Sequence, residues 1–184
     1  MKSILISIRP KWCELIASGK KTIEVRRTRP KIETPFKCYI YCTQSGKYKK
    51  GKSVKNIWMN RGTDRRFIGN GKVIGEFVCR HIEPLKPSLE SYGIYDIDDD
   101  YLRRTCLTHD VLWKYGNGAT LYAWIISDLK IYDKPRELSE FCMPCKTSCE
   151  DCKNPLFYDC WLEKGKIKKV TRPPQSWMYV EELS

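Results

Sequence analysis

The sequence predicts a small mixed β-barrel of the α+β class. The chain has 184 residues, and its 41% hydrophobic and 12% aromatic residues are enough to bury the core of one domain. Several short stretches carry the apolar pattern of strands, whereas only a few carry the spacing of helices. Neither a repeat nor a low-complexity tract interrupts them. Short strands with few helices favour such a barrel.

The N-terminal residues predict a strand, a helix and a second strand. Residues 3–8 are apolar enough for the first strand. Pro10 suits the first position of a helix, and Gly19 can end that helix in the left-handed conformation. Polar and apolar residues then alternate strictly over 22–26. The alternation predicts a core face made of Ile23 and Val25. It places Thr22, Glu24 and Arg26 together on the opposite, polar face.

The remaining pattern predicts three further strands, two helices and an edge strand. The acidic residues 98–100 can cap the first of these helices and Thr108 the second, which Gly116 and Gly118 would end. The strands are expected over 37–43, 73–78, 121–127 and, at an edge, 176–180, and the helices over 101–106 and 109–115. Composition then divides the chain into a barrel (1–133), a Cys-rich extension (134–162) and a basic tail that returns to the barrel (163–184).

The charge balance favours a polyanionic partner. Lys and Arg total 34 against 22 Asp and Glu, which gives a net charge of +12. An excess of this size indicates nucleic acid before membrane. The apolar run near the start is too short for a signal peptide or a membrane span, so we expect a cytoplasmic protein without a membrane partner.

The Cys-rich extension predicts a structural metal site. In a reducing compartment, metal ligation is a better interpretation of clustered cysteines than disulfides. Four thiolates in two Cys-x2-Cys pairs suit tetrahedral Zn²⁺, and the segment has too few apolar residues to order itself without a metal. An iron–sulfur cluster is the alternative. The expected ligands are Cys142, Cys145, Cys149 and Cys152, with Cys160 as a substitute for Cys149 or Cys152.

A basic loop matches the P-loop pattern by residue type alone. Residues 46–53 satisfy it, but neither a helix cap nor a parallel-sheet pattern follows. We therefore interpret the loop as a solvated basic segment that touches phosphates rather than as a nucleotide-hydrolysis site. Its aromatic residues Tyr48 and Trp58 are the best candidates for stacking on bases.

A third motif places a lysine, a carboxylate and a guanidinium at one helix-to-strand corner. The residues are Lys21, Glu24 and Arg26, after the corner residue Gly19. The lysine could serve as a phosphate clamp, a general base or an amine nucleophile, and the arginine could hold a phosphate. An ordinary charged strand face with ion pairs is the alternative.

The segment from Ser7 to Pro10, the helix after it and the Gly-x-Lys-x-x-Glu-x-Arg motif at 19–26 resemble the ASCH family (activating-signal-cointegrator homology) of the PUA-like barrels. The resemblance covers roughly residues 1–133. It implies a PUA-like barrel whose motif lines a cleft that recognises RNA or a modified nucleotide. Some similar proteins look like ribonucleases, and others remove the acetyl group from N4-acetylcytidine. The pattern of those amidohydrolases has a threonine where this chain has Glu24.

Three functional hypotheses follow. In the first, a binding module uses Lys21 and Arg26 for phosphate and Glu24 for the amino group of a base. In the second, an RNA-directed ribonuclease or nucleoside amidohydrolase uses Lys21 as base or nucleophile and Glu24 as proton shuttle. In the third, the Cys-rich extension is an adaptor for a protein partner. We favour the binding module, because no His, Ser or Cys accompanies the motif in the sequence.

Overall fold

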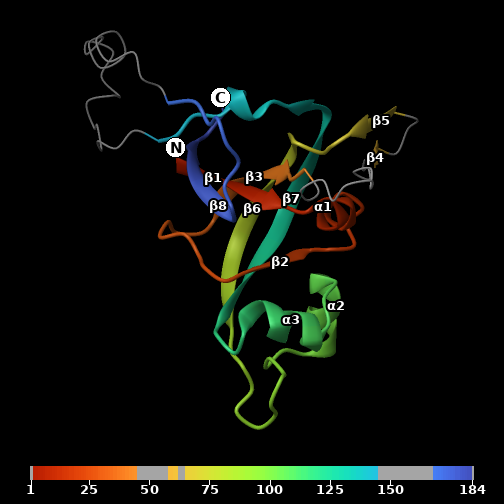
Figure 1. The fold of residues 1–184 in the computed structure, drawn as a ribbon, viewed down its shortest axis with the longest axis vertical. Helices are drawn as coiled ribbons and strands as arrows, with labels where there is room; N and C mark the ends of the chain where they lie inside the picture. The colour runs from red at the N-terminus through yellow and green to blue at the C-terminus, as the bar shows by residue number, and fades with distance from the viewer. Residues whose placement is uncertain (1, 45–57, 62–64, 145–167, 184) are drawn as a thin grey trace, which may run out of the picture.

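A computed structural model of the chain describes residues 2–44, 58–61, 65–144 and 168–183 (Figure 1). The strands are β1 (Lys2–Ile8), β2 (Ile23–Arg26), β3 (Phe36–Cys42), β4 (Trp58–Arg61), β5 (Arg65–Ile68), β6 (Lys72–Leu85), β7 (Leu121–Arg136) and β8 (Trp177–Glu181). The helices are α1 (Pro10–Ala17), α2 (Asp99–Thr105) and α3 (His109–Gly116), and a 3-10 turn spans Leu138–Glu140. The α+β class is confirmed, and so is the edge position of the last strand, because β8 ends the strand order of its sheet.

Six of these strands form one mixed sheet in the order β2-β7-β6-β3-β1-β8, and β4 pairs with β5. β1 runs parallel to β3, whereas the other neighbours are antiparallel. The sheet is not closed, so the prediction of a barrel needs correction: among the described residues no backbone ladder joins β2 to β8. β2 has only four residues, and in the described part of the chain it pairs on one side only, with β7.

Side chains bridge the two sheet edges instead. Arg26 Nη2 donates to Ser7 O at 2.7 Å. After β2, Thr28 Oγ1 accepts from Trp177 Nε1 at 3.0 Å, and Lys31 N donates to the Tyr179 hydroxyl at 2.8 Å. We call this junction of residues 26–31 with residues 174–179 the β2–β8 seam.

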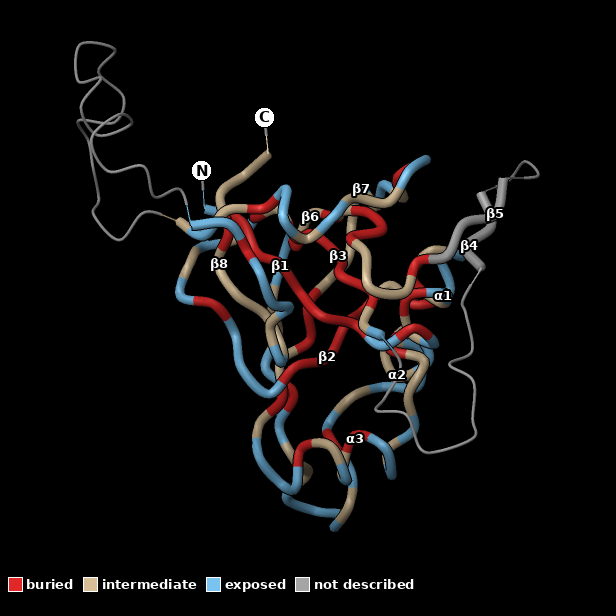
Figure 2. The backbone as a smooth tube through the Cα atoms, turned by 45° about the horizontal axis from the view of Figure 1, so that its top comes forward, coloured by how far each residue is buried: buried red, intermediate tan, exposed pale blue. Residues whose placement is uncertain are grey.

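The core consists of three apolar clusters. The largest lies on the sheet face that carries Ile6, Ile40 and the fully buried Trp124. A second covers the opposite face under Phe141 and Val170. The third joins α2 and α3 to β2, with the predicted core residues Ile23 and Val25. Figure 2 shows β2 buried along its whole length, which is why its polar side chains also lie inside the protein.

The helix caps confirm most of the local expectations. Asp98 Oδ1 accepts from Tyr101 N at 2.7 Å, and Thr108 Oγ1 accepts from Val111 N at 3.3 Å. The end of α3 differs from the prediction, because Asn117 and not Gly116 is the first residue in the left-handed region, with φ of 52°. Gly116 is required for packing instead: a Cβ there would lie 1.8 Å from the Tyr95 hydroxyl oxygen.

β6 and β7 are much longer than the sequence predicts, at 14 and 16 residues. Their pairing shifts register at three places, and each irregularity breaks the period-two pattern that would have shown a continuous strand. The extra residues of β6, up to Leu85, pair with the first residues of β7 and carry this end of the ladder toward α2 and α3 (Figure 1). The extra residues of β7 lie at the opposite end, where Arg136 pairs with Val73.

The described residues on either side of the Cys-rich segment pair with each other. Met143 N donates to Lys168 O at 2.9 Å, and Val170 N donates to Phe141 O at 2.8 Å. Glu181 N also donates to Cys142 O, so this pairing continues from β8. We call residues 141–143 with 168–170 the stem. The proposed domain limits stay a prediction, although β7 runs on to Arg136. Within the described residues, no helix has the length and hydrophobicity to cross a membrane.

Candidate functional site

Lys21 is held at the corner between α1 and β2. Gly19 makes this corner with φ of 74°, a conformation that favours glycine. Lys21 N then donates to Leu15 O at 3.0 Å, and Nζ donates to Thr105 O at the end of α2 at 2.6 Å. The Nζ also lies 5.4 Å from the centre of the Trp12 ring. Only 2% of Lys21 is exposed, so it joins two helices from inside the protein.

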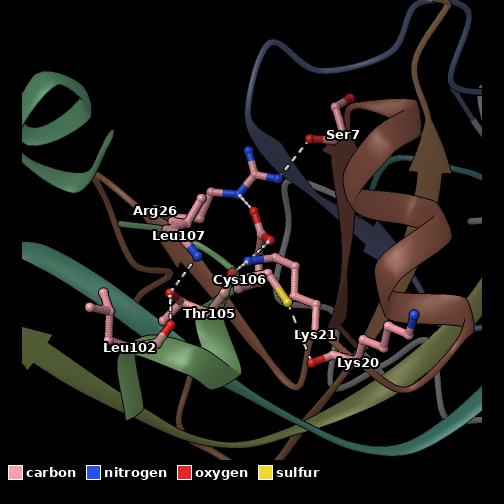
Figure 3. A network of polar contacts seen from close by, with 9 residues as sticks. Ser7, Lys20, Lys21, Arg26, Leu102, Thr105, Cys106 and Leu107 are labelled. Carbon is pink, nitrogen blue, oxygen red and sulfur yellow. Dashed lines mark hydrogen bonds and ion pairs between the residues drawn. The ribbon is translucent and has the colours of Figure 1, made fainter. Parts of the chain in front are cut away.

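Glu24 lies between two cations. Its Oε2 is 3.4 Å from Lys21 Nζ, and its Oε1 is 3.1 Å from Arg26 Nε. Figure 3 shows Lys21 and Arg26 directed toward the same point, with Arg26 continuing to Ser7. Glu24 is 6% and Arg26 8% exposed. We call Lys21, Glu24 and Arg26 the triad.

The triad carries a net positive charge in the protein interior. Two cations and one carboxylate leave an excess of one charge where solvation is poor, and such an excess is costly unless polar partners compensate it. The backbone oxygens of Ser7 and Thr105 supply part of this compensation. Arg26 Nε and Glu24 Oε2 are held by their ion pairs alone and form no hydrogen bond among the described residues. Buried polar atoms without a hydrogen bond are uncommon, and each one in a native structure calls for an explanation.

The burial of the triad excludes an ordinary charged strand face, and its contacts limit the chemical roles open to Lys21. An ordinary charged strand face would be solvated, but these side chains are buried. The contacts of Lys21 Nζ, a carbonyl oxygen and a carboxylate, are those of an ammonium group. On Arg26, Nη2 and Nε are engaged, whereas the third nitrogen points away from these partners in Figure 3. This nitrogen is the part of the triad that is best placed for a further hydrogen bond.

Most other predicted site residues lie outside the described part of the chain. Tyr48 does, and of Trp58 only its backbone position in β4 is described. Of the metal set, Cys142 lies in the stem, whereas the others fall outside: Cys145, Cys149, Cys152 and Cys160. Within the residues that the structure describes, no group of metal-binding side chains is found. The metal site therefore stays a prediction.

The sequence interpretation missed a group of buried thiols beside the triad. Cys13, Cys38, Cys42 and Cys79 all belong to the largest core cluster. Burial raises the pKa of the Cys13 thiol well above its usual value, and hydrogen bonding with Cys42 and the nearby Glu24 carboxylate raise it further. The alternation over residues 37–43 is the signal that could have found two of these thiols, since it places Cys38 and Cys42 on one face with Ile40.

Comparison with known proteins identifies the family. The family model of the ASCH domain matches residues 6–98, half of the chain. The chain belongs to the ASCH domain family. No curated protein matches its sequence significantly.

Solved structures support the fold. The ASCH crystal structure from Zymomonas mobilis is 19% identical, covers 98% of this chain and 88% of that chain, and superposes with a TM-score of 0.56. Two single-residue variants of that protein, a tyrosine-to-phenylalanine and a serine-to-alanine change, are each 18% identical with TM-scores of 0.54. They cover 99% and 98% of this chain and 92% and 89% of their own. At these identities the likeness shows the fold alone.

The triad predicts a large stability effect at Glu24. Glu24→Gln should lower the free energy of unfolding by about 3–5 kcal/mol, because it leaves two buried cations without a counter-charge. Urea denaturation at neutral pH measures this loss. Glu14→Gln on the exposed side of α1 is the matched control and should stay within about 0.5 kcal/mol of wild type. A Glu24→Gln loss as small as that of the control would show that the triad is solvated.

The buried thiols predict a loss of stability at alkaline pH. Burial raises the pKa of Cys79 from 9.0 to about 12. The folded state therefore keeps a proton that the unfolded state loses. The stability contributed by the buried thiol is complete below pH 9 and decreases as pH rises toward 12. Between pH 8 and pH 10, ionisation of Cys79 in the unfolded state alone should lower the free energy of unfolding by about 1.4 kcal/mol.

Denaturation of wild type and Cys79→Ala at both pH values tests this contribution. The stability difference between the two proteins should shrink by about that amount at the higher pH, since alanine cannot ionise. Ile74→Val, another change in the same core cluster, serves as a control whose effect should not depend on pH. A Cys79→Ala difference that stays constant with pH would contradict the prediction.

Proposed function

We propose that this chain binds RNA, or a modified nucleotide within RNA, at the surface next to the Gly19–Arg26 motif. The observation that carries the proposal is the buried triad with its excess positive charge and its incompletely bonded atoms. An anionic ligand beside Arg26 would offset that charge. Membership of the ASCH family and the net charge of +12 point in the same direction.

Each member of the triad would have its own role. Arg26 would contact the nucleotide, since its third guanidinium nitrogen is left over from the internal contacts and a guanidinium suits phosphate. Glu24 would hold that guanidinium in place and offer an acceptor for the amino group of a base. Lys21 would fix Glu24 and supply the second positive charge, while Gly19 shapes the corner.

An enzymatic role fits these contacts less well. A lysine that acts as a base or nucleophile needs a free lone pair on Nζ. Lys21 Nζ instead donates to Thr105 O and faces Glu24. We therefore favour binding over a ribonuclease or amidohydrolase activity, and a protein-adaptor role of the Cys-rich extension stays a prediction.

RNA binding is tested by fluorescence anisotropy with a labelled single-stranded RNA. Arg26→Lys keeps the buried charge but loses the guanidinium, and should weaken binding by about 1–3 kcal/mol, the value of one charge-assisted contact. Arg80→Gln is the control, because it removes a cation that is exposed and paired with Asp128. The affinity of this control should change little. Thermal unfolding of both variants checks that each affinity is measured on folded protein.

Two results would overturn the proposal. One is the absence of RNA binding by wild type at low salt, where phosphate contacts are strongest. The other is Lys21-dependent cleavage or deacylation of RNA, assayed by mass spectrometry, which would make the protein an enzyme. Lys21→Met separates a binder from an enzyme. In a binder this variant should weaken the affinity for RNA, whereas in an enzyme it should abolish turnover and leave binding nearly intact.

We also propose that the Cys-rich extension holds one structural zinc ion, with Cys142, Cys145, Cys149 and Cys152 as ligands and Cys160 as a possible substitute. The stem supports this proposal, because it fixes the backbone of Cys142 beside β8. Tetrathiolate donors suit Zn²⁺, and such sites supply folding free energy to segments with little apolar core.

Metal removal provides the corresponding prediction. Freshly purified protein should contain about one zinc per chain by elemental analysis. Chelation, or Cys145→Ser, should make residues 145–167 sensitive to trypsin while the sheet stays folded, because the sheet has its own core. Iron in place of zinc would favour the iron–sulfur alternative, and the absence of both metals would refute the site.

A further inference from the structure

The β2–β8 seam carries half-buried aromatic rings next to exposed cations. Trp177 and Tyr179 lie on one edge strand, with ring centres 5.5 Å apart. Across the seam, the guanidinium of Arg29 lies 5.9 Å from the centre of the Tyr122 ring. All three rings are neither fully buried nor fully exposed. Rings of this kind, interleaved with cations, are the usual platform for the bases of a single strand.

The cations of the seam lack carboxylate partners. Arg27, Arg29 and Lys31 are exposed, and no acidic residue separates them in the sequence. Ser7 N donates to Ser176 O and Ser7 Oγ donates to Pro174 O, which brings Arg9 and Arg172, both exposed, toward the same edge. Among the described residues, none of these five cations forms an ion pair, whereas Lys37, Lys72 and Lys114 do.

The seam also adjoins the triad. Arg26 begins the seam, and its contact with Ser7 O crosses from β2 to β1. Ser7 in turn bonds to the segment that leads into β8. A strand bound along the seam would therefore pass next to the guanidinium that we propose as the nucleotide contact.

We infer that the β2–β8 seam, with the adjoining Tyr122 of β7 and Arg172, binds a single-stranded RNA segment: bases stack on Trp177 and Tyr122, and Arg29, Lys31 and Arg172 contact phosphates. The inference rests on the proposed function and extends it from one nucleotide to a strand. It favours single strands over duplexes, because stacking needs unpaired base faces. It also predicts little sequence preference, since every base has such a face.

The test uses fluorescence anisotropy with a labelled oligouridine of about 12 nucleotides, a length that covers one such site. The double variant Arg29→Gln/Lys31→Gln should weaken binding at least tenfold and flatten the slope of log Kd against log salt by about 1.4, the value for two phosphate contacts on a single strand. The control Arg103→Gln/Lys114→Gln removes the same charge from α2 and α3 and should leave the slope unchanged.

A stacking variant and a duplex probe complete the test. Trp177→Leu should weaken oligouridine binding roughly tenfold if a base stacks there. If this variant fails to fold, the Arg29/Lys31 pair decides the question, because both residues are exposed. A duplex RNA of equal length should bind more weakly than the single strand.

The outcomes distinguish this inference from the proposed function. If Arg26→Lys weakens binding and the Arg29/Lys31 variant behaves as wild type, the seam is refuted and the proposed function stands. Equal or tighter binding of the duplex would also refute a single-strand seam. If wild type binds no RNA at low salt, both proposals are wrong.

Discussion

The contact between Glu24 and its two cations is the constraint on which the rest of the structure depends. Lys21 enters it from the end of α1 and also holds the last carbonyl of α2. Arg26 enters it from β2 and reaches β1 through Ser7 O. One carboxylate thus fixes two helices and two strands that share few backbone hydrogen bonds. Such a buried ion pair is weak evidence for stability, but it defines one arrangement well, since any other leaves a charge unpaired.

This constraint explains how the open sheet keeps its edge strands β2 and β8 together without closing into the expected barrel. A closed barrel would join β2 to β8 by backbone bonds, and would leave neither strand with an accessible edge. Here Arg26, Trp177 and Tyr179 hold the two edges together with side chains. The junction is consequently polar and aromatic at its surface, which a backbone ladder would not be. The same feature that leaves the sheet open is one of the observations that support our inference of a ligand at the seam.

The sequence predicts well those features that depend only on residues near one another in the chain. The caps at Asp98 and Thr108 and the corner at Gly19 depend on neighbouring residues, and all three were predicted. The motif at 19–26 was recognised, but its burial was not, because only packing by α2 and β1 shows that both faces of β2 are covered. The lengths of β6 and β7 were missed since bulges interrupt their pattern. Ser7 and Thr105 contribute backbone oxygens, so their side-chain types carry no signal for the site.

The stem has a consequence for how this chain tolerates change. Its paired ends, from Phe141 to Met143 and from Lys168 to Val170, are anchored in the core by two buried side chains. Whatever length of chain joins Met143 to Lys168 therefore starts and ends at fixed points. The pairing of the sheet therefore does not depend on how many residues lie between these two points.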